Sequence, residues 1–221
     1  MTVNEIYSII LAASAAAAAG LVGAFALMKR TILAGDVMSH IALPGLGLAL
    51  LWGINPLLGG TATLFLGILI IWKLENKTRL TTEVVICVIF ASAVAVGALV
   101  TPEEELIHAL FGGFGKLSLA EFIIGFLLSA TVIFLLWRLK DRLVIGLFST
   151  ELASATKIST NLLGLYFLLI FGLAIIVGLR FLGAILVGSL VIIPAAAARQ
   201  LTHTLGSFLI TSSAIGVVSM V

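Results

Sequence analysis

Charged residues are scarce in this sequence: Asp, Glu, Lys and Arg make up 10% of its 221 residues, whereas hydrophobic residues make up 62%. Soluble domains usually contain about a quarter charged residues. The composition therefore excludes a soluble fold for most of the chain and indicates helices that span a membrane, each of which needs about 20 apolar residues. We expect an all-α fold, a polytopic helical bundle of about eight transmembrane helices that forms a single domain over residues 1–221.

Cysteine and the common catalytic motifs are also nearly absent. The only cysteine, Cys87, lies in an apolar run and cannot form an internal disulfide or a thiolate cluster, so we expect a small buried apolar residue. No G-x-x-x-x-G-K-[ST] phosphate loop occurs; residues 183–188 have the glycine spacing, but Ser189 follows instead of lysine. An H-E-x-x-H zinc motif and a serine nucleophile elbow are missing too. We therefore expect no enzymatic activity in this chain.

Apolar stretches divide the sequence into candidate spans. We expect them at residues 6–28, 37–52, 57–72, 83–100, 121–137, 162–177, 181–198 and from residue 205 onward. The Pro-Gly pair at residues 44–45 should break the second span, Asn-Pro at 55–56 should form a tight turn, and Pro194 should interrupt the seventh span. Residues 106–111 are too few to span and should form a surface or re-entrant piece.

Lys and Arg are distributed unequally between the two sides of these spans. If the spans alternate strictly, one side holds ten of the twelve, namely Lys29, Arg30, Lys73, Lys77, Arg79, Arg138, Lys140, Arg142, Lys157 and Arg199. The other side holds only Lys116 and Arg180, together with the acidic run at residues 103–105. The positive-inside rule places the first side in the cytoplasm, so we expect the N-terminus outside.

Asp36 and His40 open the second apolar stretch, four positions apart. Residues at this spacing share one face of a helix. Ionisable groups within a membrane segment are costly and usually functional, and a carboxylate with an imidazole suits Mn(II), Zn(II) or Fe(II). Two ligands are too few for such an ion, but a symmetric dimer would supply the pair twice. The pair therefore predicts a transient site for a transported metal ion, with no permanently bound cofactor.

Other interpretations of these polar residues remain open. Asp36 could cap a helix at the membrane surface while His40 bonds to a neighbour. Ser39 suits helix packing better than metal binding. His108, close behind the acidic run at residues 103–105, could belong to an entrance that attracts cations or to a solvated helix start.

The connection at residues 138–157 is the longest polar segment on the expected cytoplasmic side. It has room for a short helix, because residues 148–155 begin with Ser and Thr caps and continue with helix formers. If ATP energises transport, a separate subunit must hydrolyse it and dock on such a surface. An ordinary connecting loop is the alternative.

Three motifs occur together in this chain. Residues 35–45 read G-D-V-M-S-H-I-A-L-P-G, residues 110–112 read L-F-G, and residues 183–186 with 193–199 read G-A-I-L and I-P-A-A-A-A-R. In combination they resemble the permease subunits of bacterial manganese, zinc and iron ABC importers. The resemblance extends from the first helix to the end of the chain. Members usually continue for about one more hydrophobic stretch, so we expect the last helix to be truncated.

The resemblance implies a homodimer in the bacterial plasma (inner) membrane, cytoplasmic ATPase subunits, and an extracellular or periplasmic protein that delivers the metal ion. In similar permeases the Asp and His that match Asp36 and His40 are implicated in metal passage. The family's ATPase-coupling segment reads F-D-x-E-L-A and then a glycine. The residues that match it here are Phe148, Glu151, Leu152 and Ala153. Ser149 replaces the aspartate and Lys157 replaces the glycine.

Two other functions remain open besides such a permease. The chain could be a stand-alone secondary carrier or channel for a cation, or an ABC permease of the siderophore or cobalamin type. The lack of a chain of buried carboxylates for proton coupling argues against the carrier, and the Asp-His pair argues against a large organic substrate. In every case membrane lipid surrounds the protein, and no nucleic acid is expected as a partner.

Overall fold

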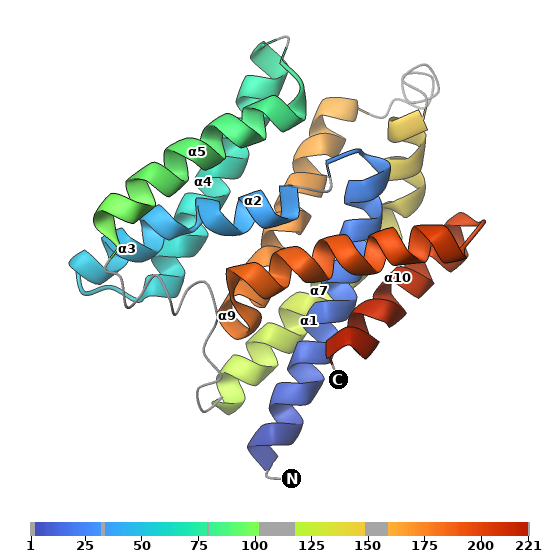
Figure 1. Cartoon of the computed structure of the whole chain (residues 1–221), viewed down its shortest axis with the longest axis horizontal. Helices are drawn as coiled ribbons and strands as arrows, with labels where there is room; N and C mark the ends of the chain where they lie inside the picture. The colour runs from blue at the N-terminus through green and yellow to red at the C-terminus, as the bar shows by residue number, and fades with distance from the viewer. Residues whose placement is uncertain (1–2, 32–33, 79, 102–117, 149–158, 221) are drawn as a thin grey trace.

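The computed structural model of the chain describes residues 3–31, 34–78, 80–101, 118–148 and 159–220. These residues form helices, as predicted (Figure 1). The helices are α1 (Val3–Met28), α2 (Ala34–Ile41), α3 (Leu43–Leu51), α4 (Pro56–Lys77), α5 (Thr82–Val100), α7 (Leu119–Phe148), α9 (Thr160–Leu201) and α10 (Leu205–Met220).

Within the described residues, 7 helical stretches are long and apolar enough to cross a membrane, and Leu205–Met220 is a shorter apolar helix. The segment Ala34–Leu51, which contains α2 and α3, counts as one of the seven, whereas α9 contains two of them, Thr160–Leu179 and Leu182–Leu201. The expected bundle of about eight membrane helices is therefore confirmed.

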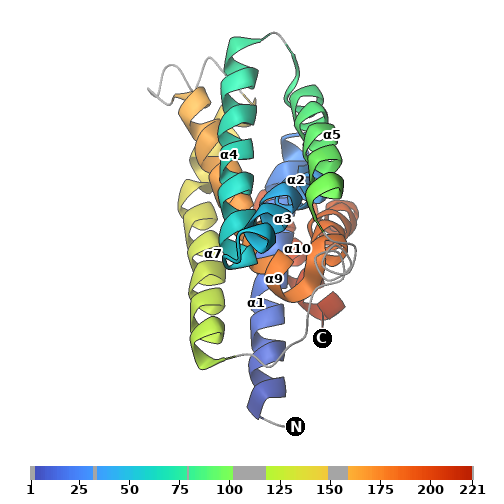
Figure 2. The same cartoon turned by 90° about the vertical axis from the view of Figure 1, so that its left-hand side faces the viewer.

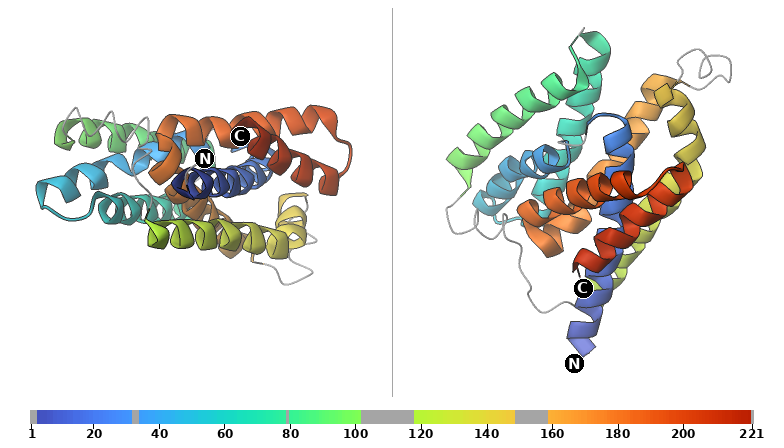
Figure 3. Two further views of the ribbon diagram at one scale, coloured as in Figure 1. Left: turned by 90° about the horizontal axis from the view of Figure 1, so that it is seen from below. Right: turned by 45° about the vertical axis from the view of Figure 1, so that its right-hand side comes forward.

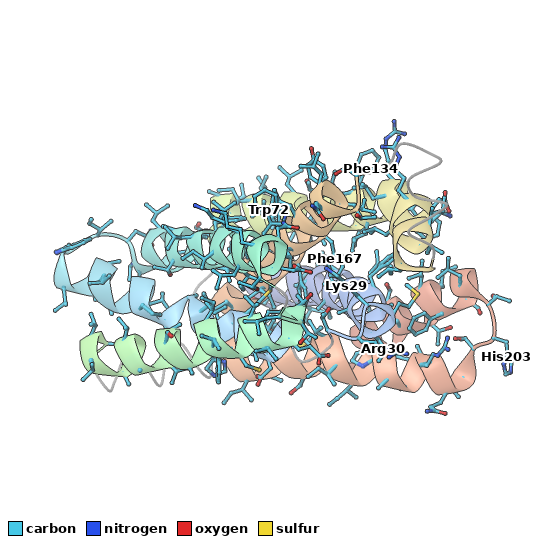
Figure 4. All side chains as sticks on the ribbon, turned by 90° about the horizontal axis from the view of Figure 1, so that it is seen from above. Lys29, Arg30, Trp72, Phe134, Phe167 and His203 are labelled. Atoms are coloured by element: carbon cyan, nitrogen blue, oxygen red, sulfur yellow. The ribbon has the colours of Figure 1, made fainter. Side chains whose placement is uncertain are left out.

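The helices form an elongated slab of packed layers. In Figure 3 (left) and Figure 4, α5 and the second half of α9 lie in one outer layer, and α4 and α7 lie in the other, with α1, α2 and α3 between them. α1 packs against α7, α9 and α10, and its side chains Leu11, Val22 and Phe25 are buried. Figure 2 shows α2 and α3 between α4 and α5. Other helices therefore flank α2, burying Ser39 and leaving Asp36 and His40 half-buried.

The predicted break in the second span lies at Ala42, between α2 and α3, rather than at Pro44 itself. Pro44 occupies the first turn of α3. A proline is tolerated there because the backbone N–H groups of a first turn have no acceptor within the helix. Neighbouring hydroxyls support the joint: Thr63 Oγ1 donates to the Ala42 carbonyl (3.4 Å) and Thr101 Oγ1 to the Leu43 carbonyl (3.3 Å). The predicted turn after α3 is also confirmed, since the Asn55 side chain accepts a hydrogen bond at the start of α4.

Two predictions about the later spans were wrong. α7 does not end near Trp137 but continues to Phe148, because Leu136 and Leu143 are buried on one face while charged residues occupy the exposed face. Residues 138–148 of the expected connection therefore belong to α7. α9 likewise passes through Pro194 to Leu201, since neighbouring helices stabilise a proline inside a membrane bundle.

The backbone of α9 instead departs from helical angles at Gly183 (φ 76°, ψ 167°), near the start of its second span. Glycine adopts such a positive φ without the steric cost that a Cβ would add. Cys87, expected to be buried, is exposed on α5. The segment at residues 106–111, His108 and the acidic run at 103–105 lie outside the described residues.

Candidate metal site

α2 begins after a tight turn at the end of α1. Arg30 has a positive φ of 61°, and the N–H of Thr31 donates to the Ala26 carbonyl (2.9 Å), which ends α1. α2 then passes across the second half of α9. Gly35 permits this approach, since a Cβ on it would lie 2.8 Å from Cγ1 of Val191.

Asp36 is the third residue of α2 and is half-buried. Its carboxylate lies against Gly188 of α9, where Oδ1 is 2.8 Å from the position that a Cβ on Gly188 would take. No described residue donates a hydrogen bond to this carboxylate or forms an ion pair with it, although the backbone carbonyl of Asp36 accepts two. The carboxylate oxygens are therefore available to a ligand.

His40 is half-buried one turn further along the same face of α2. Its Nδ1 lies 2.9 Å from the backbone carbonyl of Asp36. A carbonyl oxygen can only accept, so in the neutral imidazole Nδ1 carries the hydrogen and Nε2 is the nitrogen with a free lone pair. The ring also meets Phe90 of α5 edge-on, with the ring centroids 5.5 Å apart. A carbonyl that fixes one nitrogen of a histidine while the other stays open is the usual arrangement around a metal-ligating imidazole.

Ser39 is fully buried between these two residues. Its hydroxyl donates to the carbonyl of Asp36 (2.6 Å) and lies 3.3 Å from Nδ1 of His40. The hydroxyl is thus used within the helix, as expected for a packing residue rather than a metal ligand.

The structure therefore places Asp36 and His40 on one face of α2, with the imidazole prepared to ligate. Among the described residues there is no group of three or more His, Cys, Asp or Glu that could hold a metal ion. Sequence reasoning missed two neighbours of the pair, Gly188 and Phe90. The glycine spacing at residues 183–188 was the one sequence feature that could have drawn attention to Gly188. No local sequence feature sets Phe90 apart from the other apolar residues of its span.

A second candidate region is a cavity of about 260 Å³ between the ends of α1, α4 and α7 and the start of α9. Lys29, Trp72 and Phe167, labelled in Figure 4, line it together with Glu75. Trp72 Nε1 donates to the Asn161 carbonyl (2.9 Å), which ties α4 to α9. Residues on both flanks of the predicted coupling segment also line this cavity. Of that segment, Phe148 ends α7, whereas residues 149–158 lie outside the described part of the chain.

Lys29, which lines this cavity, should make the stability of the protein depend on pH. Burial lowers the pKa of the Lys29 ammonium below its ordinary value of 10.5, and the nearby Glu75 carboxylate opposes that shift. Its Nζ lies 5.6 Å from the centroid of the Phe167 ring. Between the lowered pKa and 10.5, the unfolded chain binds more protons than the folded one, so the free energy of unfolding should rise with pH. Thermal unfolding of Lys29→Met in detergent should show a flatter alkaline rise than the unchanged protein, and an equally steep rise would contradict this account.

Comparison with known proteins agrees with these features. The ABC 3 transport family profile matches residues 4–221. The manganese transport system membrane protein MntC of Listeria monocytogenes is 26% identical over 91% of this chain and 74% of its own length. The high-affinity zinc uptake system membrane protein ZnuB of Haemophilus influenzae is 29% identical over 82% of this chain and 72% of its own length. The structure of PsaBC from Streptococcus pneumoniae in complex with Fab matches with a TM-score of 0.83 at 25% identity, covering 99% of this chain and 80% of that one. This chain therefore belongs to the ABC 3 transport family, as its three motifs indicate.

Proposed function

We propose that this protein is the membrane-spanning permease subunit of an ABC importer that moves a divalent transition metal ion, Mn, Zn or Fe, into the cytoplasm. The observation that carries the proposal is the pairing of Asp36 with His40 on one face of α2, where Nδ1 of His40 is fixed and Nε2 is open. Relatives named for manganese transport and for zinc uptake support the choice of cargo. Because the sequence has no nucleotide-binding loop, ATP hydrolysis belongs to a separate subunit.

A homodimer would complete the metal site. Asp36 and His40 supply two ligands, whereas zinc takes about four and manganese up to about six. α2 packs against α5 and α9, and in Figure 1 it lies between α5 and the second half of α9. Two copies that meet where α2 lies between α5 and the second half of α9, related by a two-fold axis, would bring two Asp-His pairs together. A site assembled from halves also releases its ion readily, as transport requires.

The other partners follow from the same proposal. Cytoplasmic ATPase subunits drive the cycle, and an extracellular or periplasmic metal-binding protein delivers the ion to the permease in the plasma (inner) membrane. Metal analysis of the permease purified with its ATPase subunit tests the proposal directly. We expect Mn, Zn or Fe to bind, and uptake into vesicles to require ATP. Uptake that proceeds without an ATPase would support the stand-alone carrier instead, and retention of an organic chelate would support the siderophore or cobalamin type.

We propose that the N-terminus lies outside the cell. The basic residues Lys77 and Arg142 would then face the cytoplasm, whereas positions 104 and 116, which lie outside the described residues, would face outward. Single cysteines at these four positions, in a Cys87→Ser background, should react with an impermeant thiol reagent only at 104 and 116. Labelling of position 77 in sealed cells would refute this orientation.

We also propose that the segment matched by Phe148, Glu151, Leu152 and Ala153 docks the ATPase. Glu151→Arg should lower both uptake and transport-linked ATP turnover while the protein still assembles, since it introduces like-charge repulsion or removes packing at one contact. The matched control, Glu151→Gln, keeps the shape of the side chain and should have a smaller effect. Unchanged uptake and ATP turnover in Glu151→Arg would return the segment to an ordinary loop.

A further inference from the structure

Gly188, in the second half of α9, faces Asp36 of α2 directly. A Cβ on Gly188 would lie 2.8 Å from Oδ1, 3.1 Å from Cα and 3.2 Å from Cβ of Asp36. Carbon atoms in favourable contact are about 3.5–4.0 Å apart. Any side chain at position 188 would therefore displace Asp36, through either its carboxylate or the backbone of α2.

The backbone of α2 has little room to move away. Gly35 lies against Val191, on the same region of α9, and a Cβ on Gly35 would be 2.8 Å from Cγ1 of that valine. On the opposite side, Ile41 of α2 packs onto Gly67 of α4. The ring of His40 meets Phe90 of α5. Since three helices hold α2, the displacement would fall mainly on the Asp36 carboxylate.

The two candidate ligands are held in different ways. His40 is oriented by its hydrogen bond to the Asp36 carbonyl and by the Phe90 ring. The Asp36 carboxylate has no hydrogen-bond partner among the described residues, and it lies beside Gly188, where Oδ1 is 2.8 Å from the position that a Cβ would take. The carboxylate thus depends on α9 for its placement, whereas the imidazole does not.

We propose that Gly188 is a positioning residue for the metal site: the absence of a side chain at this position sets where the Asp36 carboxylate lies relative to Nε2 of His40, and so sets the affinity and metal preference of the site. This inference rests on the proposed function. It also gives a role to Gly188, which follows residues 183–186 of the third sequence motif: it shapes the site that the motif at residues 35–45 supplies.

The test measures initial rates of Mn²⁺ and Zn²⁺ uptake in vesicles that contain the permease with its ATPase subunit. Gly188→Ala should raise the half-saturating metal concentration by about tenfold to a hundredfold, the range seen when support of a metal ligand is lost. The ratio of the Mn²⁺ and Zn²⁺ values should change as well. Gly206→Ala is a control, because nothing lies within 4 Å of a Cβ there. Gly172→Ala, whose Cβ would meet Ile68, should lower stability without changing the ratio.

The outcomes separate this inference from the proposed function. If Asp36→Asn transports normally, the metal site proposed at Asp36 and His40 fails, whatever Gly188→Ala does. If Asp36→Asn is inactive but Gly188→Ala keeps wild-type half-saturation for both ions, only the positioning role is overturned. Should Gly188→Ala fail to assemble, it is repeated with Val191→Ala, which gives α2 room to shift. The half-saturating metal concentration of the double variant should then differ from that of Val191→Ala alone. Identical concentrations would overturn the inference.

Discussion

Asp36→Asn should abolish metal uptake without loss of assembly. The substitution keeps the size of the side chain but removes the negative charge and one of the two oxygen ligands, which a divalent ion requires at a site with few ligands. In the structure the carboxylate is half-buried, and no described residue donates a hydrogen bond to it. Its removal should therefore affect the ion and not the fold. Uptake of ⁵⁴Mn²⁺ or ⁶⁵Zn²⁺ at equal expression is the measurement.

The helix-cap interpretation of Asp36 makes the opposite prediction. Asparagine caps a helix about as well as aspartate, so a capping role would leave uptake intact in Asp36→Asn, and that result would end the ligand hypothesis. His40→Ala, which removes the second ligand, should be as inactive as Asp36→Asn. Ser39→Ala is the matched control on the same turn and should be mild, because the Ser39 hydroxyl bonds within the helix.

Gly45→Ala should strongly destabilise the fold, although it adds a single methyl group. A Cβ on Gly45 would overlap the carbonyl of Gly59, and a Cβ on Gly59 would overlap the carbonyl of Gly45. Backbone atoms cannot turn aside as a flexible side chain can, so α3 and α4 would have to separate. Overpacking of this kind costs about 3 kcal/mol at the upper end of its usual range. The thermal unfolding midpoint of the detergent-solubilised protein measures the effect.

Gly206→Ala serves as the control for Gly45→Ala, because it makes the same change in a helix where no atom lies within 4 Å of the new methyl group. It should leave the unfolding midpoint nearly unchanged. A wild-type midpoint for Gly45→Ala would mean that α3 and α4 are further apart than the structure places them. Because α3 follows α2 after Ala42, a partly folded Gly45→Ala protein should also lose metal uptake.

The sequence by itself determined the class of fold, most of the spans and the placement of Asp36 and His40, the pair that we propose binds the metal ion. A segment that crosses the hydrocarbon of a membrane must be a long apolar run whose backbone is hydrogen-bonded internally. The order of the spans can therefore be predicted from a sequence with 10% charged residues. The same constraint makes Asp36 and His40 conspicuous. Their shared helix face follows from four-residue spacing alone, and the structure confirms it.

Only the tertiary structure decided where helices end and what surrounds the pair. The charged residues after Trp137 predicted a loop, but burial of Leu143 continues α7 to Phe148. Pro194 predicted a break, but the change of direction occurs at Gly183. Gly188 and Phe90 reach Asp36 and His40 from helices distant in sequence. A local sequence pattern reflects how favourable it is to place that segment in a membrane. Contacts between distant helices depend on how the segments pack together, and no local pattern specifies that packing.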